Sequence, residues 1–285
     1  MSDRLKILAP AKINWSLAIV GQREDGYHLL RSIMQQIALY DEVEIKESSA
    51  DYCFCSGLMD QENLAFRAWL RLKEQLCLKQ CLEIRIEKEI PIGAGLAGGS
   101  TDAAAVLLGA NRLLALGLPE AELLSLALPL GADIPFCISG GACLVEGIGE
   151  KLTPLPEVQT SWLVLANPGF PVSTPMVYRE YDRLGSSARP DLAGVRAALE
   201  TNSSQRLTEC WGNHLYDAAC SLYPALNRMT EAFSALGLPA LMSGSGGTFF
   251  APCSGEKEAR EAADRLQMFF PWAMAVSTLM TEKQM

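Results

Sequence analysis

Several features that mark other classes of protein are missing from these 285 residues. No apolar run approaches the ~18 residues that a membrane span requires, and the apolar stretch after Met1 is too short for the core of a secretion signal. Lysine and arginine number 24 against 33 aspartates and glutamates, a net charge of −9. A general nucleic-acid or anionic-membrane binder is normally basic, so we expect a cytoplasmic protein without such partners.

Paired metal-binding cysteines are also missing, although the chain has nine cysteines. No Cys-x-x-Cys pair occurs, and the nearest pairs, Cys53/Cys55 and Cys77/Cys81, lack the partners of a structural zinc site. An odd number of cysteines without a secretion signal favours reduced thiols that pack as small apolar side chains. The composition, 49% hydrophobic and 20% charged, is that of a globular chain, and its length allows about two domains or one large one.

The order of the expected elements predicts an α+β fold in two packed halves, because strands and helices mix without regular β-α-β alternation. Apolar patterns predict strands over 5–20, 41–46, 82–90, 140–145, 162–166 and 273–279, and a strand, glycine turn and strand over 239–253. Helices are expected over 61–79, 100–116, 119–128, 191–200, 204–220, 224–236 and 256–268. A change of composition near Pro154 predicts two domains, 1–155 and 156–285.

The most informative segment is glycine-rich and runs from Pro91 to Asp102, between an expected strand and an expected helix. Glycines let backbone N–H groups turn toward one point, and the following helix adds the positive end of its dipole. A glycine turn between strand and helix is the simpler alternative, but this stretch holds more glycine than a turn needs. We therefore favour a site for phosphate.

Familiar phosphate motifs do not fit this segment. Gly93-x-Gly95-x-x-Gly98 matches the dinucleotide fingerprint, but the required second strand is replaced by an expected helix at 119–128. The spacing also resembles a Walker A loop in which Gly99 replaces the lysine. The signatures of protein kinases are absent, and Gly244–Gly247 lacks the spacing of a serine-hydrolase loop. A cation for the phosphates must therefore come from elsewhere in the chain.

Lys12 is the candidate for that cation. It shares the polar face of a strand that we expect to be half-buried with Asn14, while Ile13, Trp15 and Leu17 form the apolar face. Taken alone, such a lysine is more often solvated. Asp133 is the candidate carboxylate, since it stands between apolar residues shortly before a proline; from local sequence it is either a turn-former or a site residue.

Together, these segments resemble the GHMP kinase superfamily over nearly the whole chain, from Leu8 to the last strand. The first motif is Pro10–Asn14, followed by Gly26-Tyr27-His28, and this combination is the more specific signal. The second motif is Pro91–Ala105 and the third is Leu241–Thr248, with further matches at 131–135 and 167–175. The resemblance implies a two-domain α+β fold with the active site in the cleft between the domains.

The combination with Gly-Tyr-His resembles the branch that phosphorylates, with ATP, the 2-hydroxyl of a cytidine-diphosphate-linked methylerythritol. This reaction is a step of the non-mevalonate pathway to isoprenoid precursors. The partners that the resemblance implies are therefore ATP and a small cytidylyl substrate. It implies Lys12 and Asp133 as the catalytic pair, with Mg²⁺ accompanying ATP and Ser100 or Thr101 as the nearest hydroxyl ligands.

Binding roles follow from the same resemblance, residue by residue. The residues expected to hold the ATP phosphates are Pro91, Ile92, Gly93, Ala94, Gly95, Leu96, Ala97, Gly98, Gly99, Ser100 and Thr101. Tyr27 and His28 are expected to contact the cytosine, with Tyr178 closing on its other face. Asn14 and Thr174 match positions near the diphosphate and erythritol parts.

The chain departs from the usual motifs in small ways, and two other functions stay open. Ala97 and Thr101 replace a common glycine and serine, which should be tolerated, and we expect His214 to have a packing or surface role. A homoserine or mevalonate kinase is one alternative, against which Gly26-Tyr27-His28 argues. A binding protein without catalysis is the other, against which the presence of both Lys12 and Asp133 argues.

Overall fold

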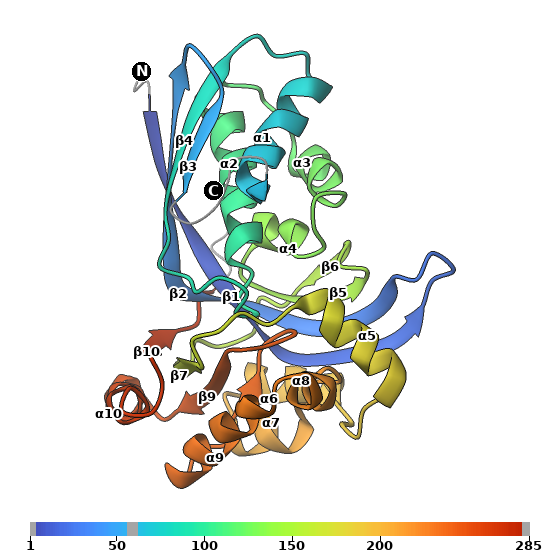
Figure 1. Ribbon diagram of the computed structural model, residues 1–285, viewed down its shortest axis with the longest axis vertical. Coiled ribbons are helices and arrows are strands. Elements are labelled where there is room, and N and C mark those ends of the chain that lie inside the picture. The colour runs from blue at the N-terminus through green and yellow to red at the C-terminus, as the bar shows by residue number, and fades with distance from the viewer. Residues whose placement is uncertain (1–3, 56–61, 281–285) are drawn as a thin grey trace. The chain divides into compact units, whose positions relative to one another are not determined.

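The computed structural model describes residues 4–55 and 62–280, which form two compact units (Figure 1). Unit 1 comprises Met1–Ala11, Leu39–Ile90 and Ala97–Gly140, and unit 2 comprises Lys12–Ala38, Pro91–Leu96 and Gly141–Met285. Two long strands, β1 (Arg4–Gln22) and β2 (His28–Ser48), pass through both units. The units therefore interleave in sequence, and the single boundary expected after residue 155 stays a prediction.

In unit 1, the sheet continues from the second half of β2 to β4 (Cys81–Glu87) and then to β3 (Tyr52–Cys55). β4 is antiparallel to β2 and parallel to β3. Alternate residues such as Val43, Ile45 and Ile84 are buried on one face. The helices α1 (Leu64–Gln75) and α2 (Gly98–Leu113) lie side by side along this sheet (Figure 1).

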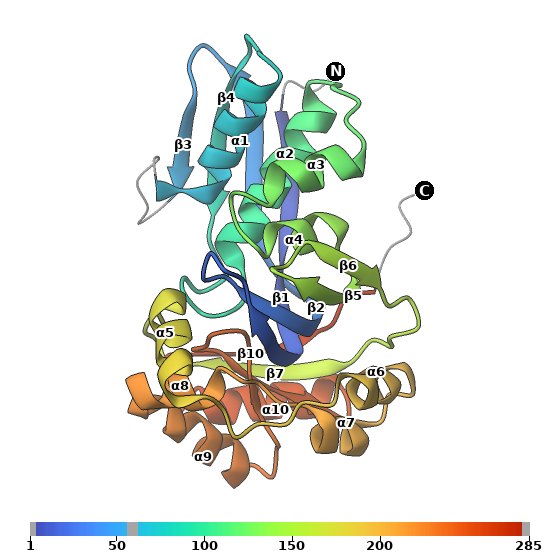
Figure 2. The same ribbon diagram turned by 90° about the vertical axis from the view of Figure 1, so that its right-hand side faces the viewer.

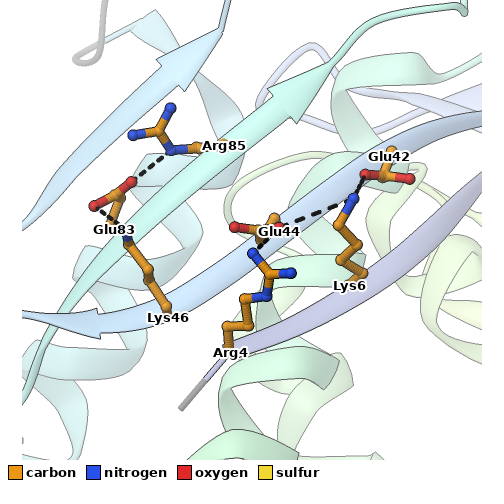
Figure 3. Close-up of polar contacts among 7 residues, drawn as sticks. All are labelled: Arg4, Lys6, Glu42, Glu44, Lys46, Glu83 and Arg85. Atoms are coloured by element: carbon orange, nitrogen blue, oxygen red, sulfur yellow. Dashed lines mark hydrogen bonds and ion pairs between the residues drawn. The ribbon is translucent and has the colours of Figure 1, made fainter. Parts of the chain in front are cut away.

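The alternate positions of these strands carry charges (Figure 3). The charged side chains on this face of β1, β2 and β4 include Arg4, Lys6, Glu42, Glu44, Lys46, Glu83 and Arg85. Lys46 Nζ lies 2.9 Å from Glu83 Oε2, and its hydrogen bond is the main reason that the pKa of Glu83 falls to about 2. Opposite charges on neighbouring strands favour this register, because a shift by one residue would turn the charges toward the helices.

Two shorter helices complete unit 1. They are α3 (Glu120–Ala127) and α4 (Ile134–Ser139), and both pack against α2. α1 begins after Asn63, whose side chain accepts a hydrogen bond from the backbone N–H of Ala65 (2.9 Å). Such a cap satisfies one of the N–H groups that a helix start leaves without a partner.

Unit 2 is built on two groups of strands. β5 (Ala142–Gly147) pairs with the first half of β2 and with β6 (Lys151–Pro154). A separate antiparallel sheet has the order β10 (Trp272–Ser277), β7 (Trp162–Asn167), β9 (Phe249–Cys253), β8 (Leu241–Met242).

Both faces of this second sheet are covered. On one face, Val164 and Phe249 belong to a buried cluster with side chains of α8 (Tyr216–Leu222), α9 (Asn227–Ala235) and α10 (Glu256–Leu266) (Figure 2). On the other face, Phe250 meets the ring of Trp15 edge-on, with centroids 5.3 Å apart. β1 is therefore enclosed where it passes through unit 2.

The remaining helices of unit 2 are α5 (Thr174–Leu184), α6 (Leu192–Glu200) and α7 (Ser204–Cys210). The prediction of one helix over 204–220 is wrong, because the chain leaves the helix between α7 and α8. There, Leu17 on β1 donates to Gly212 O and accepts from His214 N, both at 2.9 Å. These backbone bonds replace two that a continuous helix would make.

The α+β class is confirmed, and most predicted elements lie within a few residues of the observed ones. The half-buried first strand is a clear error. Lys12, Asn14 and Ser16, which form its polar face, are only 3%, 1% and 0% exposed. Burial of polar side chains requires hydrogen-bond partners, so this error points directly to the site described below.

Two further expectations concern the cysteines and membranes. All nine cysteines are free thiols, although only Cys53, Cys137 and Cys143 are fully buried. None of the helices in the described ranges combines the length and the apolar character that crossing a bilayer requires.

Candidate functional site

The glycine-rich loop leaves unit 1 after Ile90 and returns to it at Ala97, where α2 is about to begin. Gly93 and Gly95 have φ angles of +64° and +77°. Ala97 adopts the same left-handed region with φ +60° as the residue before α2. Left-handed residues among right-handed ones give the concave backbone that binds anions.

Four successive carbonyl groups of this loop, those of residues 93–96, bond to the rest of unit 2. Val172 N donates to Gly93 O and Thr248 N to Ala94 O, both at 3.0 Å. Gly95 O accepts from Lys12 Nζ (3.1 Å), and Leu96 O accepts from Lys12 N (3.1 Å). In a trans peptide the N–H points opposite to the preceding C=O, so the N–H groups of residues 94–97 turn away from these partners. The loop therefore presents a row of backbone N–H donors, while these carbonyl acceptors are occupied by bonds within unit 2.

Gly95 fits this loop because no side chain has room there. A Cβ atom at this position would lie 2.2 Å from Ser243 O and 2.9 Å from Gly246 O. Both neighbours belong to the glycine stretch between β8 and β9, so two backbone segments touch at Gly95. Ser243 Oγ reinforces the contact by donating to Gly95 O (3.0 Å).

Lys12 projects from the enclosed part of β1 toward the same loop. Its ammonium donates to Asn14 Oδ1 at 2.8 Å in addition to Gly95 O. Asn14 is held in turn, since its Nδ2 donates to Ser32 Oγ (2.8 Å) and its backbone N to Ser243 Oγ (3.3 Å). Within unit 2 the structure therefore places a buried cation beside a glycine loop that has no lysine of its own.

Asp133 and the end of the glycine segment lie in unit 1. Asp133 is half-buried and immediately precedes α4, which packs against α2. A Cβ at Gly131, two residues earlier, would lie 4.0 Å from Ser100 Oγ in the first turn of α2. The segment with Asp133 is thus a neighbour of residues Ala97–Thr101, while the approach of Lys12 and Asp133 stays a prediction.

A second group of predicted residues gathers where β2 begins and α5 lies. The rings of His28 and Tyr178 are 4.9 Å apart, and His28 Nε2 donates to Asp182 Oδ1 at 2.6 Å. Tyr181 meets His28 edge-on, and its pKa is raised by burial. Tyr27 is 62% exposed, so its ring lies open next to a hydrogen-bonded imidazole.

Thr174, at the start of α5, is hydrogen-bonded to the third motif, Leu241–Thr248. Its hydroxyl shares a hydrogen bond with Ser245 Oγ (2.7 Å). In the same stretch, Thr248 Oγ1 accepts from Asn167 Nδ2 (3.0 Å), and Gly244 O accepts from Asn213 Nδ2 (2.7 Å). Segments 167–175 and 241–248 therefore form one hydrogen-bonded shell around the loop.

Two residues of these groups, Ser243 and Asp182, were missed from the sequence as site residues. Ser243 ties β1 to the glycine loop, and it stood in the third motif without a role. Asp182 holds His28, and it carried no signal because α5 was not expected. His214 was expected to pack: its Nδ1 accepts from Ile19 N (3.0 Å), its ring stacks on Tyr181, and burial lowers its pKa.

Two models of known families match this chain, one in each half. Residues 63–141 match the model of the GHMP kinases N terminal domain, and residues 188–271 match that of the GHMP kinases C terminal domain. These two matches cover more than half of the chain, which belongs to the GHMP kinase family.

The particular group within the family follows from similarity over nearly the full length. The chain is 41% identical to a 4-diphosphocytidyl-2-C-methyl-D-erythritol kinase of Citrifermentans bemidjiense, covering 97% of this chain and 99% of that relative. A crystal structure of 4-(cytidine 5'-diphospho)-2C-methyl-D-erythritol kinase matches with a TM-score of 0.82 and 35% identity, over 96% of this chain and 99% of that one. A homoserine kinase from Cytophaga hutchinsonii matches with a TM-score of 0.74 over 98% of this chain and 96% of that chain. At 20% identity, this last likeness shows the fold alone.

Proposed function

We propose that this chain transfers the γ-phosphoryl group of ATP to the 2-hydroxyl of 4-diphosphocytidyl-2-C-methyl-D-erythritol. The observation that carries the proposal is the glycine loop, whose successive carbonyls bond to unit 2 while a buried lysine lies against it. Such a loop attracts phosphate oxygens by its N–H groups and does not repel them by its C=O groups.

Lys12 supplies the positive charge that the loop itself lacks. Because the side chain is 3% exposed, water screens its charge little, and its bonds to Asn14 and Gly95 fix the position of the ammonium. A preorganised cation of this kind stabilises negative charge that develops on a transferring phosphoryl group. Phosphoryl transfer depends mainly on such positioning and charge stabilisation.

Asp133 is proposed as the group that orients the 2-hydroxyl and accepts its proton. The hydroxyl oxygen attacks the γ-phosphorus, the bond from that phosphorus to the β,γ-bridging oxygen breaks, and ADP leaves. The proton of the hydroxyl passes to a carboxylate oxygen of Asp133 as the new P–O bond forms. Lys12 then balances the charge on the transferring group.

Recognition of the substrate is proposed for the residues of β1, the hairpin between β1 and β2, and α5. Tyr27 and Tyr178 would stack on the two faces of the cytosine, and His28 would bond to its edge. Asn14 and Thr174 would contact the diphosphate and erythritol parts. The hydrogen bond that His28 donates to Asp182 holds the imidazole in one orientation, which recognition of a flat ring requires.

Magnesium is proposed to arrive with ATP. Within the described ranges, no group of three or more His, Cys, Asp or Glu side chains could hold a metal ion. Thr101 is 1% exposed, whereas Ser100 is partly exposed at the N-terminus of α2, so Ser100 fits better as a hydroxyl ligand. The bound ion would neutralise charge on the β- and γ-phosphates.

The compartment is proposed from the cysteines. Nine free thiols fit a reducing compartment, and we place the reaction in the cytoplasm.

The proposal is tested by measuring ADP release with a panel of acceptors. The cytidylyl substrate should stimulate turnover, whereas homoserine and mevalonate, the acceptors of other GHMP kinases, should not raise it above the rate with ATP alone. Stimulation by homoserine or mevalonate alone would overturn the substrate assignment. ATP binding without any turnover on the whole panel would favour a binding protein.

His28→Ala and Tyr178→Ala should each raise KM for the cytidylyl substrate, and each should leave KM for ATP nearly unchanged. Stacking on a base is worth about 1–3 kcal/mol, so Tyr178→Ala should raise this KM roughly 5- to 150-fold, and His28→Ala should raise it by removing the hydrogen bond to the base edge. Tyr52→Phe is a suitable control, because the contacts of that side chain, with Phe54 and Glu83, lie in unit 1. A change confined to KM for ATP would mean that these residues contact ATP and not the cytidylyl substrate.

Gly95→Ala should weaken ATP binding by at least about tenfold, because the new methyl group would push the loop away from Ser243 O, and misplacement by ~1 Å is costly. Gly237→Ala is the matched control, since Gly237 has a φ of +72° with nothing within 4 Å of its added Cβ. Calorimetric titration with ATP compares the two variants. Equal affinities would mean that the contact of the loop with Ser243 is irrelevant to the nucleotide.

A further inference from the structure

Three charged side chains, none of which has a role in the proposed chemistry, are buried where the glycine loop leaves and rejoins unit 1. Asp41 comes from β2, Lys88 from the segment after β4, and Asp102 from the second turn of α2. Their side chains are only 0%, 11% and 3% exposed. The loop runs between the second and the third of these positions.

Asp41 holds the chain at the point where the loop begins. Its Oδ1 accepts hydrogen bonds from the backbone N–H groups of Glu89 (2.7 Å) and Ile90 (2.9 Å), the last residues of unit 1 before Pro91. Its Oδ2 accepts from Lys88 Nζ. One carboxylate on β2 therefore fixes three groups of the strand-to-loop connection.

Lys88 links that connection to the helix on the far side of the loop. Its ammonium donates to Asp102 Oδ2 at 2.7 Å as well as to Asp41. A Cβ at Gly98, the first residue of α2, would lie 3.1 Å from Lys88 Nζ. Burial disfavours the charged ammonium, but the carboxylates of Asp102 and Asp41 outweigh it and raise the pKa of Lys88.

This cluster is poorly suited to a purely stabilising role. Two carboxylates share one ammonium, so the group carries an excess of negative charge if all three are ionised. Asp102 Oδ1 is buried with no hydrogen-bond partner. Removing such groups from water costs free energy, and apolar side chains of similar volume often stabilise a core equally well. What the ionic cluster adds is a fixed geometry between the two ends of the loop.

We propose that Asp41, Lys88 and Asp102 form a clamp that fixes both ends of the glycine loop in its phosphate-binding conformation. The three are positioning residues, because they act through the loop backbone and the first turn of α2. The inference rests on the proposed function only in naming ATP as the ligand of the loop. It adds an element that the three sequence motifs do not explain.

Lys88→Met is the first test, because it removes the ammonium and keeps most of the volume. We expect the Kd for ATP to rise at least about tenfold, since small displacements in a binding site are costly. KM for the cytidylyl substrate should change by less than about threefold. A tenfold change corresponds to ~1.4 kcal/mol, so this effect is small. Lys73→Met is the matched control in the same unit: Lys73 Nζ lies 2.6 Å from Asp51 Oδ2, in a part-buried pair away from the loop. It should lower the melting temperature and leave ATP affinity as in the wild type.

The double variant Lys88→Met/Asp102→Asn separates positioning from stability. It relieves the carboxylate that Lys88→Met leaves unpaired, so the melting temperature should recover in part. ATP affinity should stay weak, because the link between the loop start and α2 is still broken. It also serves if Lys88→Met alone does not fold.

The outcomes are distinct. ATP affinity at the wild-type level in folded Lys88→Met, or its recovery together with the melting temperature in the double variant, would overturn the clamp. The titration uses ATP alone, so a wild-type protein that bound ATP without phosphorylating the cytidylyl substrate would contradict the proposed function and leave this test intact.

Discussion

Asp133→Asn is expected to lower kcat by roughly 10²-fold or more, the range for loss of a general base. The amide keeps the shape of the side chain, but it cannot accept the proton of the substrate hydroxyl. It also removes the negative charge that would face Lys12. ATP affinity should change little, because the carbonyls of the loop bond to Val172, Thr248 and Lys12. Steady-state rates at saturating ATP and cytidylyl substrate measure the effect.

Asp191→Asn provides the control for this variant. Asp191 also precedes a helix, and its side chain accepts from Gly194 N to cap α6. An asparagine caps a helix nearly as well, so kcat should stay at the wild-type value. If Asp133→Asn retained a near-normal kcat as well, the proton acceptor would have to be another group, or none.

Lys12→Met is expected to lower kcat by about 10²- to 10³-fold, the range for loss of one preorganised donor to developing charge. Methionine fills a similar volume, so Asn14 and Ser243 should keep their contacts and the fold should persist. ATP affinity should fall as well, because the loop loses the only lysine among its described contacts. The ratio of the two effects separates transition-state stabilisation from binding.

Lys6→Met is the matched control on the same strand. Lys6 is half exposed on the charged face of unit 1, where it pairs with Glu42 and Glu44 (Figure 3). Exposed ion pairs contribute little, so this variant should behave as the wild type. Equal losses in both lysine variants would point to damage to β1 rather than to a role for the Lys12 ammonium.

Alternation was a reliable guide where one face of a strand meets helices and the other meets water. Residues 82–87 are such a case, and β4 was predicted to within a few residues. The same rule failed for Lys12 and Asn14, because the strand that carries them is covered on both faces. Local alternation reports which residues differ in polarity, whereas burial of the polar face depends on segments far along the chain.

Helices were predicted well where apolar residues recur on one face, and poorly elsewhere. In α5, only Val177 is fully buried, so its sequence carries little periodic signal. The residues between α7 and α8 carry a helical pattern, but Asn213 and its neighbours bond to β1 and to the glycine stretch at 242–244. Tertiary hydrogen bonds overrode local propensity at that point.

The candidate site was predictable in part, because glycine loops have strong local signatures. The loop of residues 91–97 was recognised from its composition, and Lys12 was sought because the loop lacked a lysine. Ser243 and Asp182 were not found, since a serine in a glycine stretch and an acid on an unpredicted helix have many ordinary roles. The same holds for Lys88, whose partners lie 47 and 14 residues away.

Phosphorus NMR of the reaction products tests the central claim most directly. With ATP and the cytidylyl substrate, we expect the diphosphate signals of the substrate to be joined by one new phosphate monoester signal, formed in proportion to ADP. Because carbon 2 carries the methyl group and no hydrogen, that signal should lack three-bond proton coupling, whereas a phosphate on any other hydroxyl would be split by the protons of its carbon. Inorganic phosphate with an unchanged substrate, or a phosphate on another hydroxyl, would contradict the proposed reaction.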